Sequence, residues 1–341
     1  MTQIQASEKT YIEELATNQL RNLMVICERL FLEFNEESQA DEMAKKIANK
    51  LQDEPELLGI MLQKEAVECL FHLWDMEESN IMKESYLREL QQLRYLGFIS
   101  MDEETLFVNM EAKDIFFFSM KGHRMKSDIE KYTQWEKVIF GMLFSYGILD
   151  IYYCYQIFKK IMNLDITYDQ MEEFFMIRII FWNSGLMLRN QTDMRLFFAS
   201  REVTDRNEIF DQWNQRPELK FREYTKDEYI NLAMGNGIIS WDGIPEFFSF
   251  VLDEIEDDRY KAMLIMKSIV LMVQNGSAYP DIVLQVISLL DEESREKKQI
   301  ISDFVERIYY SIPVYGQKGY SRNELKDKHD RIFQVIDGGK C

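Results

Sequence analysis

Glycine and proline, the residues that most often form turns, are scarce in this chain and restrict the folds open to it. Only 14 Gly and 5 Pro occur in 341 residues, whereas Met alone contributes 20. A sandwich or barrel of many short strands needs more turn-forming residues, while Met, Leu, Glu and Lys favour helices. Since 46% of the residues are hydrophobic, the chain can also bury a large core. We therefore predict a mostly α, multi-helical protein.

The distribution of apolar residues and cysteines indicates the cellular compartment of the protein. No window approaches 18 consecutive apolar residues and residues 1–10 are polar, so we expect neither a membrane-spanning segment nor a secretion signal. Cys27, Cys69 and Cys154 lie within apolar helical patterns, far from one another and from Cys341. This pattern predicts reduced, buried thiols in a cytoplasmic protein without a membrane partner.

Acidic residues outnumber basic ones, and this bears on the class of partner. The chain has 59 Asp and Glu against 40 Lys and Arg, a net charge of −19. Such a charge repels nucleic acid at long range, because affinity for phosphates comes mainly from Lys and Arg. A nucleic-acid function would therefore need a local basic patch.

The pattern of the first 130 residues predicts a helical segment and, after it, a unit of two helices and a β-hairpin. Apolar residues at helical spacing continue to the break at Asp53-Glu54-Pro55, so we expect an N-terminal helical segment over residues 1–55. In residues 56–130, helices at 57–73 and 83–96 precede two short apolar runs around residues 102–104, which predict a β-hairpin. Two helices followed by a hairpin is the order of a winged helix-turn-helix, so this is the first winged-helix-like unit.

Residues 131–207 repeat this order with a different sequence. Three predicted helices precede the apolar runs 186–188 and 194–198, which flank the polar turn 190–193. We interpret this segment as a second winged-helix-like unit.

The remainder predicts a C-terminal helical bundle over 208–325 and a flexible tail over 326–341. The bundle helices are expected at Lys226–Met234, Ile244–Ile255, Tyr260–Gln274, Asp281–Leu290 and Ser294–Ser311.

The run from Val138 onward and the segment 316–325 resemble a family of uncharacterised Firmicute proteins that often end in a SEC-C zinc motif. Residues 213–219 and 273–276 fall where similar stretches are expected. The resemblance implies a Rho-N-like helical start, a paired helical and winged-helix region and an acidic helical bundle, and the family has no established activity to transfer. A SEC-C site needs clustered cysteines, whereas this tail offers Cys341 alone, so we predict no zinc ligand.

The second helix of the first unit carries the candidate nucleic-acid residues Lys83, Arg88 and Arg94, with Gln91 and Gln92 as possible donors to base edges. Acidic residues on the same helix and at the hairpin tip would oppose phosphate. We favour an ordinary solvated face and keep nucleic-acid binding as the alternative function.

The corresponding helix of the second unit is acidic. Asp169, Glu172 and Glu173 face only Arg178 as a counter-charge, so we expect DNA to be repelled. By analogy with other acidic winged helices, this helix favours docking of a protein.

A dense acidic run is the candidate site for binding a basic protein or a second copy of the chain. Its members are Asp253, Glu254, Glu256, Asp257 and Asp258. The simpler interpretation, which we favour, is a solvated connector.

The chain shows no recognisable catalytic constellation. His72, His123 and His329 are scattered, and Gly235-Asn236-Gly237 lacks the Lys-Ser/Thr of a P-loop. We therefore predict no catalytic residue, metal site or cofactor. The expected function is that of a non-enzymatic, cytoplasmic interaction protein that binds a protein partner, or itself, through acidic and apolar surfaces.

Overall fold

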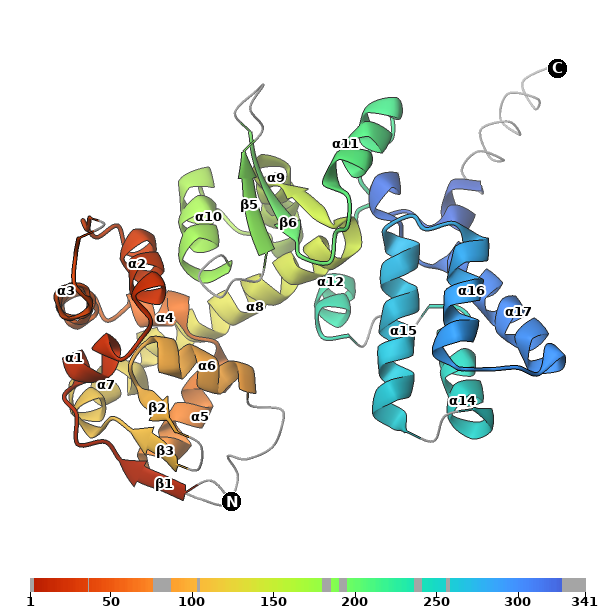
Figure 1. Ribbon diagram of the computed structural model, residues 1–341. Coiled ribbons are helices and arrows are strands. Elements are labelled where there is room, and N and C mark those ends of the chain that lie inside the picture. The colour runs from red at the N-terminus through yellow and green to blue at the C-terminus, as the bar shows by residue number, and fades with distance from the viewer. Residues whose placement is uncertain are drawn as a thin grey trace. The chain divides into compact units, whose positions relative to one another are not determined.

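The structure is a computed structural model of the chain, and helices dominate it (Figure 1). It describes residues 3–35, 37–75, 87–102, 105–179, 185–189, 195–235, 241–255 and 258–326. The prediction of a mostly α protein is confirmed, and the strands form two small three-stranded sheets. None of the helices in the described ranges is long and apolar enough to cross a bilayer.

The contacts within the chain divide it into two compact units. Unit 1 comprises Met1–Glu136 and Ile166–Ser184, and unit 2 comprises Lys137–Asp165 and Gly185–Cys341. The first boundary falls inside helix α8 (His123–Tyr146). Residues 131–207, predicted as one winged-helix-like unit, are therefore divided between the two units. The finer five-segment division remains a prediction.

Unit 1 packs short amphipathic helices around one core, in which Tyr11, Trp74, Phe98 and Phe116 are buried with their rings in contact. The predicted helix 57–73 is two helices, because Gln63 is extended and starts a new helix at Lys64. The helices are α1 (Tyr11–Ala16), α2 (Leu20–Arg29), α3 (Ala40–Asp53), α4 (Leu57–Met61), α5 (Lys64–Trp74), α6 (Leu87–Tyr95), α7 (Met110–Lys121) and α10 (Tyr168–Phe174), which continues into the π-helical turn η3 (Phe175–Ile179).

The sheet of unit 1 contains the predicted hairpin and one strand that the sequence did not indicate. β2 (Ile99–Met101) and β3 (Thr105–Val108) pair antiparallel, as expected. β1 (Gln3–Ala6) pairs parallel with β3 from the other side. β1 is a mostly exposed edge strand, so it carries no apolar alternation from which to predict it.

The sheet of unit 2 has the same strand order. β5 (Gly185–Arg189) and β6 (Leu196–Ser200) form the second predicted hairpin, and β4 (Ile148–Asp150) pairs antiparallel with β6. Gly147, at φ +71°, links the end of α8 to β4. Asp150 ends the strand and caps α9 (Ile151–Met162) by accepting a hydrogen bond from the Tyr153 amide.

The rest of unit 2 is helical, as predicted. α14, α15, α16 and α17 enclose a core that includes Val251, Ile269, Val286 and Val305. The described helices are α11 (Arg206–Gln215), α12 (Lys226–Ala233), α14 (Ile244–Glu254), α15 (Arg259–Gln274), α16 (Tyr279–Leu289), α17 (Arg295–Ser311) and the 3-10 turn η4 (Tyr315–Gln317). The predicted flexible tail, residues 326–341, lies outside the described residues except for Lys326.

Candidate functional site

The predicted nucleic-acid face is only partly described. Lys83 lies outside the described residues, and only the backbone of Arg88 is described, in α6. Arg94 is exposed near the end of α6. Gln92, suggested as a base-edge donor, is 1% exposed, and its side-chain oxygen accepts a hydrogen bond from the Gln63 amide at 3.4 Å. The suggestion for Gln92 is therefore wrong, because its side chain points into the core of unit 1.

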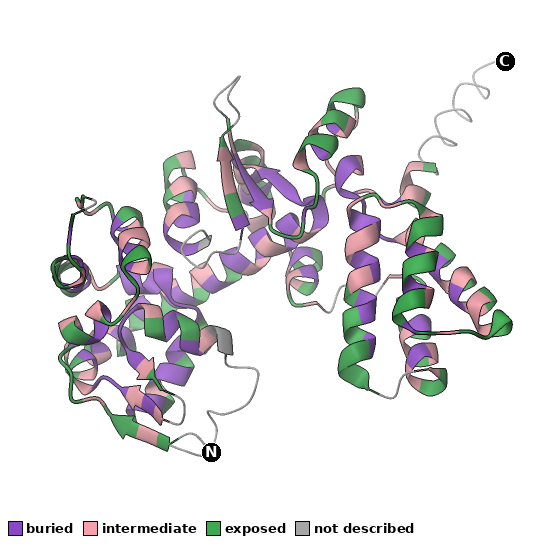
Figure 2. Cartoon of the chain, viewed as in Figure 1, coloured by how far each residue is buried: buried purple, intermediate pink, exposed green. Residues whose placement is uncertain are grey.

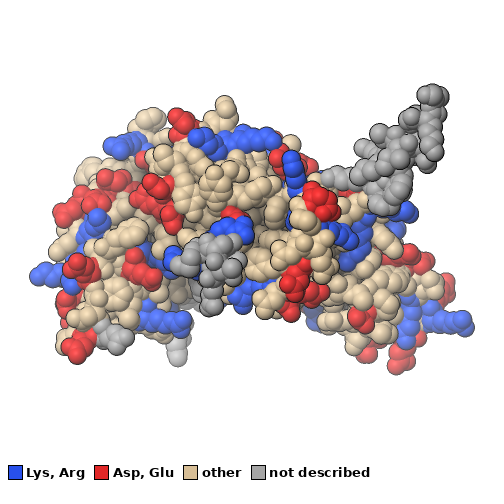
Figure 3. Space-filling view, turned by 90° about the horizontal axis from the view of Figure 1, so that it is seen from above, with Lys and Arg blue, Asp and Glu red and all other residues tan. Residues whose placement is uncertain are grey.

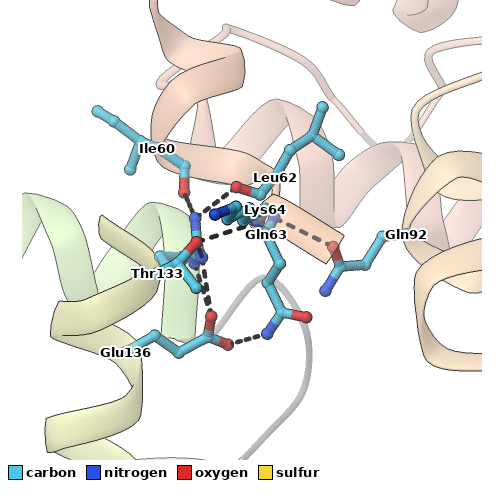
Figure 4. Close-up of polar contacts among 8 residues, drawn as sticks. Ile60, Leu62, Gln63, Lys64, Gln92, Thr133 and Glu136 are labelled. Atoms are coloured by element: carbon cyan, nitrogen blue, oxygen red, sulfur yellow. Dashed lines mark hydrogen bonds and ion pairs between the residues drawn. The ribbon is translucent and has the colours of Figure 1, made fainter. Parts of the chain in front are cut away.

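Arg178 is also not a surface charge, because its side chain is buried. Figure 4 labels its partners Ile60, Leu62, Thr133 and Glu136. The Arg178 side chain is 0% exposed and forms an ion pair of 2.9 Å with Glu136, which is 1% exposed. Its guanidinium also donates to the carbonyls of Ile60 and Leu62, at 2.8 and 2.7 Å, and to Thr133 at 3.1 Å. The expectation that Arg178 opposes an acidic surface is corrected, because the end of α4 presents carbonyls that match its planar donors.

This network has a structural role in unit 1. The second oxygen of Glu136 accepts from Gln63 Nε2 at 2.7 Å, so both partners of the pair make additional hydrogen bonds. A buried ion pair is tolerated only with such further bonds. The network of this ion pair and its hydrogen bonds joins η3 to α8 and to the α4–α5 junction.

A second buried polar cluster lies in unit 2 and consists of tyrosines. The Tyr146 hydroxyl contacts the Tyr229 hydroxyl and the Arg222 carbonyl, while Tyr224 donates to the Gly319 carbonyl at 2.7 Å. Tyr315 donates to Gln274 Oε1 at 3.1 Å. Burial raises the pKa of all four phenols well above the ordinary value. These contacts hold the segment 315–320, part of the stretch behind the family resemblance.

The acidic run surrounds the junction of α14 and α15. Asp253 and Glu254 are exposed at the end of α14, and Asp258 caps α15 by accepting from the Tyr260 and Lys261 amides at 2.8 and 3.3 Å. Lys297 Nζ lies 3.8 Å from a carboxylate oxygen of Glu254. Glu256 and Asp257 lie outside the described residues.

Directly after this run, α15 exposes apolar side chains. Tyr260 is 68% exposed, Met263 55% and Leu264 46%. The spacing i, i+3, i+4 places the three on one side of the helix, and we call them the α15 face. In Figure 2 the exposed colour covers the N-terminal end of α15 and much of the visible side of α16.

Unit 2 contains a cavity of about 1030 Å³ that was not predicted from the sequence. Its lining comes from the hairpin β5–β6, the start of α9, α11 and the segments around Phe221 and Lys318. Four basic side chains line it, namely Arg189, Arg195, Arg206 and Lys318, against two acidic ones, Asp150 and Asp205. Basic side chains thus outnumber acidic ones in the cavity lining, whereas acidic residues outnumber basic ones in the whole chain. No local motif could have signalled the cavity, because its walls come from segments far apart in sequence.

Charges elsewhere are mixed. On the face seen in Figure 3, Lys and Arg lie in several groups interspersed with Asp and Glu. Within the part of the chain that the structure describes, no three His, Cys, Asp or Glu side chains come together as metal ligands would. Cys27, Cys69 and Cys154 are buried and free, as predicted, while Cys341 falls outside that part.

Comparison with known proteins gives no relative. No protein-family model matches the chain, and no curated protein or solved structure matches it either. The resemblance to SEC-C-associated proteins therefore stays a prediction.

Proposed function

We propose that the protein is a non-enzymatic interaction protein that docks a protein partner on the α15 face. The observation that carries the proposal is the exposed apolar face of Tyr260, Met263 and Leu264 immediately after the acidic residues at the α14–α15 junction. Soluble proteins rarely leave several large apolar side chains together in water without a binding role.

The chemistry of this face indicates the kind of partner. Apolar side chains at i, i+3 and i+4 suit the apolar side of another helix, and the carboxylates of Asp253 and Glu254 attract Lys and Arg beside it. The proposed partner is therefore a basic amphipathic helix, in another protein or in a second copy of this chain. The free, buried cysteines support the further proposal of a reducing compartment, the cytoplasm.

The test uses a labelled synthetic basic amphipathic helix as the probe. We expect it to bind the full chain, and the triple change Tyr260→Ser, Met263→Ser and Leu264→Ser to weaken binding at least about tenfold. The matched control is Leu20→Ser with Phe118→Ser in unit 1, which removes exposed apolar side chains (45% and 83% exposed) elsewhere. Equal binding by the triple variant and the wild type would contradict the proposal.

Duplex DNA provides the opposing test. We expect no salt-dependent retention of the protein on duplex DNA at low salt, because of its −19 charge. Tight retention, abolished by replacing Lys83, Arg88 and Arg94 with Ala, would establish the alternative function instead.

A further inference from the structure

The cavity of unit 2 contains a continuous aromatic wall. Phe197 contacts Phe210 with ring centroids 5.2 Å apart, Phe210 contacts Trp213 at 5.5 Å, and Trp213 contacts Phe221 at 4.9 Å. Tyr153 extends the series, at 4.9 Å from Phe221. All five rings line the cavity.

This wall is held in place by its own bonds. The Trp213 indole donates to the Tyr315 carbonyl at 2.8 Å, and the contacts between Phe210 and its two neighbours are edge to face. Phe197 and Trp213 are buried. The half-buried rings of Tyr153, Phe210 and Phe221 therefore present the pre-organised apolar surface on which a planar group can pack without large side-chain ordering.

Two of the basic side chains are already committed within the protein. Lys318 Nζ donates to the carbonyls of Arg216 and Leu219, both at 2.8 Å. Arg195 lies 3.2 Å from Asp150 and has its guanidinium 5.6 Å from the Phe197 ring centre.

Arg189 and Arg206 differ from these two. Among the residues that the structure describes, neither has a carboxylate within ion-pair distance. Arg189 is exposed at the end of β5, and Arg206 is half-buried at the start of α11. Their guanidinium groups are donors suited to phosphate.

The acidic lining does not offset these two arginines. Asp150 faces Arg195, and it also accepts from the Tyr153 amide. Asp205 accepts from the Asn207 and Glu208 amides at 2.9 and 3.0 Å. Two amides at the start of α11 are thus occupied by the Asp205 carboxylate, so an anion in the cavity would be bound by the arginines and not by these amides.

We propose that this cavity binds a nucleoside phosphate, with the base packed on the aromatic wall and the phosphate bound by Arg189 and Arg206. Base stacking on aromatic rings beside basic side chains is the general mode for unpaired nucleotides. The volume lies just above the range of ordinary ligand pockets, about 300–1000 Å³, which suits a nucleotide better than a bare phosphate ion. The proposal concerns a different site from the α15 face and does not depend on it.

The shared chemistry has two possible sources, a free nucleotide or a single-stranded nucleic acid. Isothermal titration of the full chain with AMP and UMP, and separately with a 5′-phosphorylated trinucleotide, separates them. Tighter binding of the trinucleotide assigns the site to single strands, and equal or weaker binding assigns it to free nucleotides. Both outcomes support the proposal.

Variants test the two halves of the site. Arg189→Ala and Arg206→Ala should each lower the affinity about tenfold, and Phe210→Leu should weaken it several-fold. Arg295→Ala is the matched control, because it removes an exposed arginine of α17 outside the cavity, and it should leave the affinity within about twofold. Circular dichroism establishes that each variant is folded.

Four results would overturn the proposal. These are no heat of binding with any nucleotide at millimolar concentration, inorganic phosphate or adenosine binding as tightly as AMP, an oligoglutamate peptide binding as tightly as whichever of AMP and the trinucleotide binds better, and folded Arg189→Ala and Arg206→Ala variants that bind like the wild type.

Discussion

The two sheets share one strand order but obtain their third strand differently. In both, the second strand of the hairpin is central, in the orders β1-β3-β2 and β4-β6-β5. In unit 1 the third strand comes from the N-terminus and runs parallel, whereas in unit 2 it comes from between α8 and α9 and runs antiparallel. The hairpin is thus the local element common to both, and the third strand is supplied by whichever segment the surrounding helices bring to its free edge.

The two hairpins also differ in charge. In the first, Asp102 closes the turn by accepting from the Thr105 amide at 2.7 Å. In the second, Arg189 and Arg195 flank the turn and line the cavity. The same architecture therefore carries opposite local charge, and the net charge of −19 does not set the potential at each site.

The largest difference between the units is expected at alkaline pH. Unit 2 buries the phenols of Tyr146, Tyr224, Tyr229 and Tyr315, whose pKa burial raises. Among the residues of unit 1 that the structure describes, Tyr11 is the one such phenol. Above about pH 10 the unfolded chain releases these protons and the folded chain keeps them, so stability falls as the pH rises, by about 1.4 kcal/mol per pH unit for each phenol. Subtilisin pulses with mass mapping of the first cuts should show unit 2 opening first.

Thiols serve as the internal comparison for that experiment. Burial raises the pKa of Cys27 and Cys69 in unit 1 to about 11, and it also raises the pKa of Cys154 in unit 2. These thiols therefore lower the stability of both units as the pH rises. Tyr146→Phe removes one buried phenol, so it should reduce the slope of the free energy of unfolding of unit 2 against pH by the equivalent of about one proton. Unit 1 opening first would contradict the expectation.

The next largest effect is expected from the buried ion pair of unit 1. Arg178→Met removes the guanidinium that neutralises the buried Glu136 carboxylate, which should lower the free energy of unfolding by about 3–5 kcal/mol. Urea denaturation followed by circular dichroism measures it. The double variant Arg178→Met, Glu136→Leu should recover a large part of the loss, and a single variant as stable as the wild type would refute the structural role.

An intermediate effect is expected at the glycines that precede a strand in each sheet. Gly97 and Gly147 both have φ +71°, and an added Cβ would lie 2.7 Å from Leu15 and Tyr315, respectively. Gly97→Ala and Gly147→Ala should each cost about 2–3 kcal/mol in urea denaturation, from backbone strain and overpacking. Gly235→Ala is the control, because it has a positive φ with nothing within 4 Å, so the difference isolates the packing contribution.

The smallest effects are expected at the ends of the hairpins. Asp102→Ala removes the turn hydrogen bond and should cost about 1 kcal/mol, while Arg195→Gln breaks an ion pair whose arginine is 58% exposed and should cost at most about 1 kcal/mol. Calorimetric unfolding compares the two. A larger loss for Arg195→Gln would mean that the second hairpin depends on its charge for stability.

Local patterns in the sequence predicted much of the fold. Apolar spacing located the helices of the C-terminal bundle to within a few residues, and short apolar runs located both hairpins. β1 and β4 were not predicted, because three or four residues at a sheet edge leave little periodicity. The burial of Arg178 was also missed, because its partners lie more than forty residues away in sequence.

Short windows of the sequence are enough to predict the helical class, the hairpins and the buried free cysteines, since each depends on local spacing or composition. The folded chain is needed to show which charges are buried, which apolar side chains of α15 stay in contact with water, and that basic and aromatic residues from β5, β6, α9 and α11 line one cavity. Burial and electrostatic potential depend on groups that folding brings together from distant parts of the chain, so no local pattern encodes them.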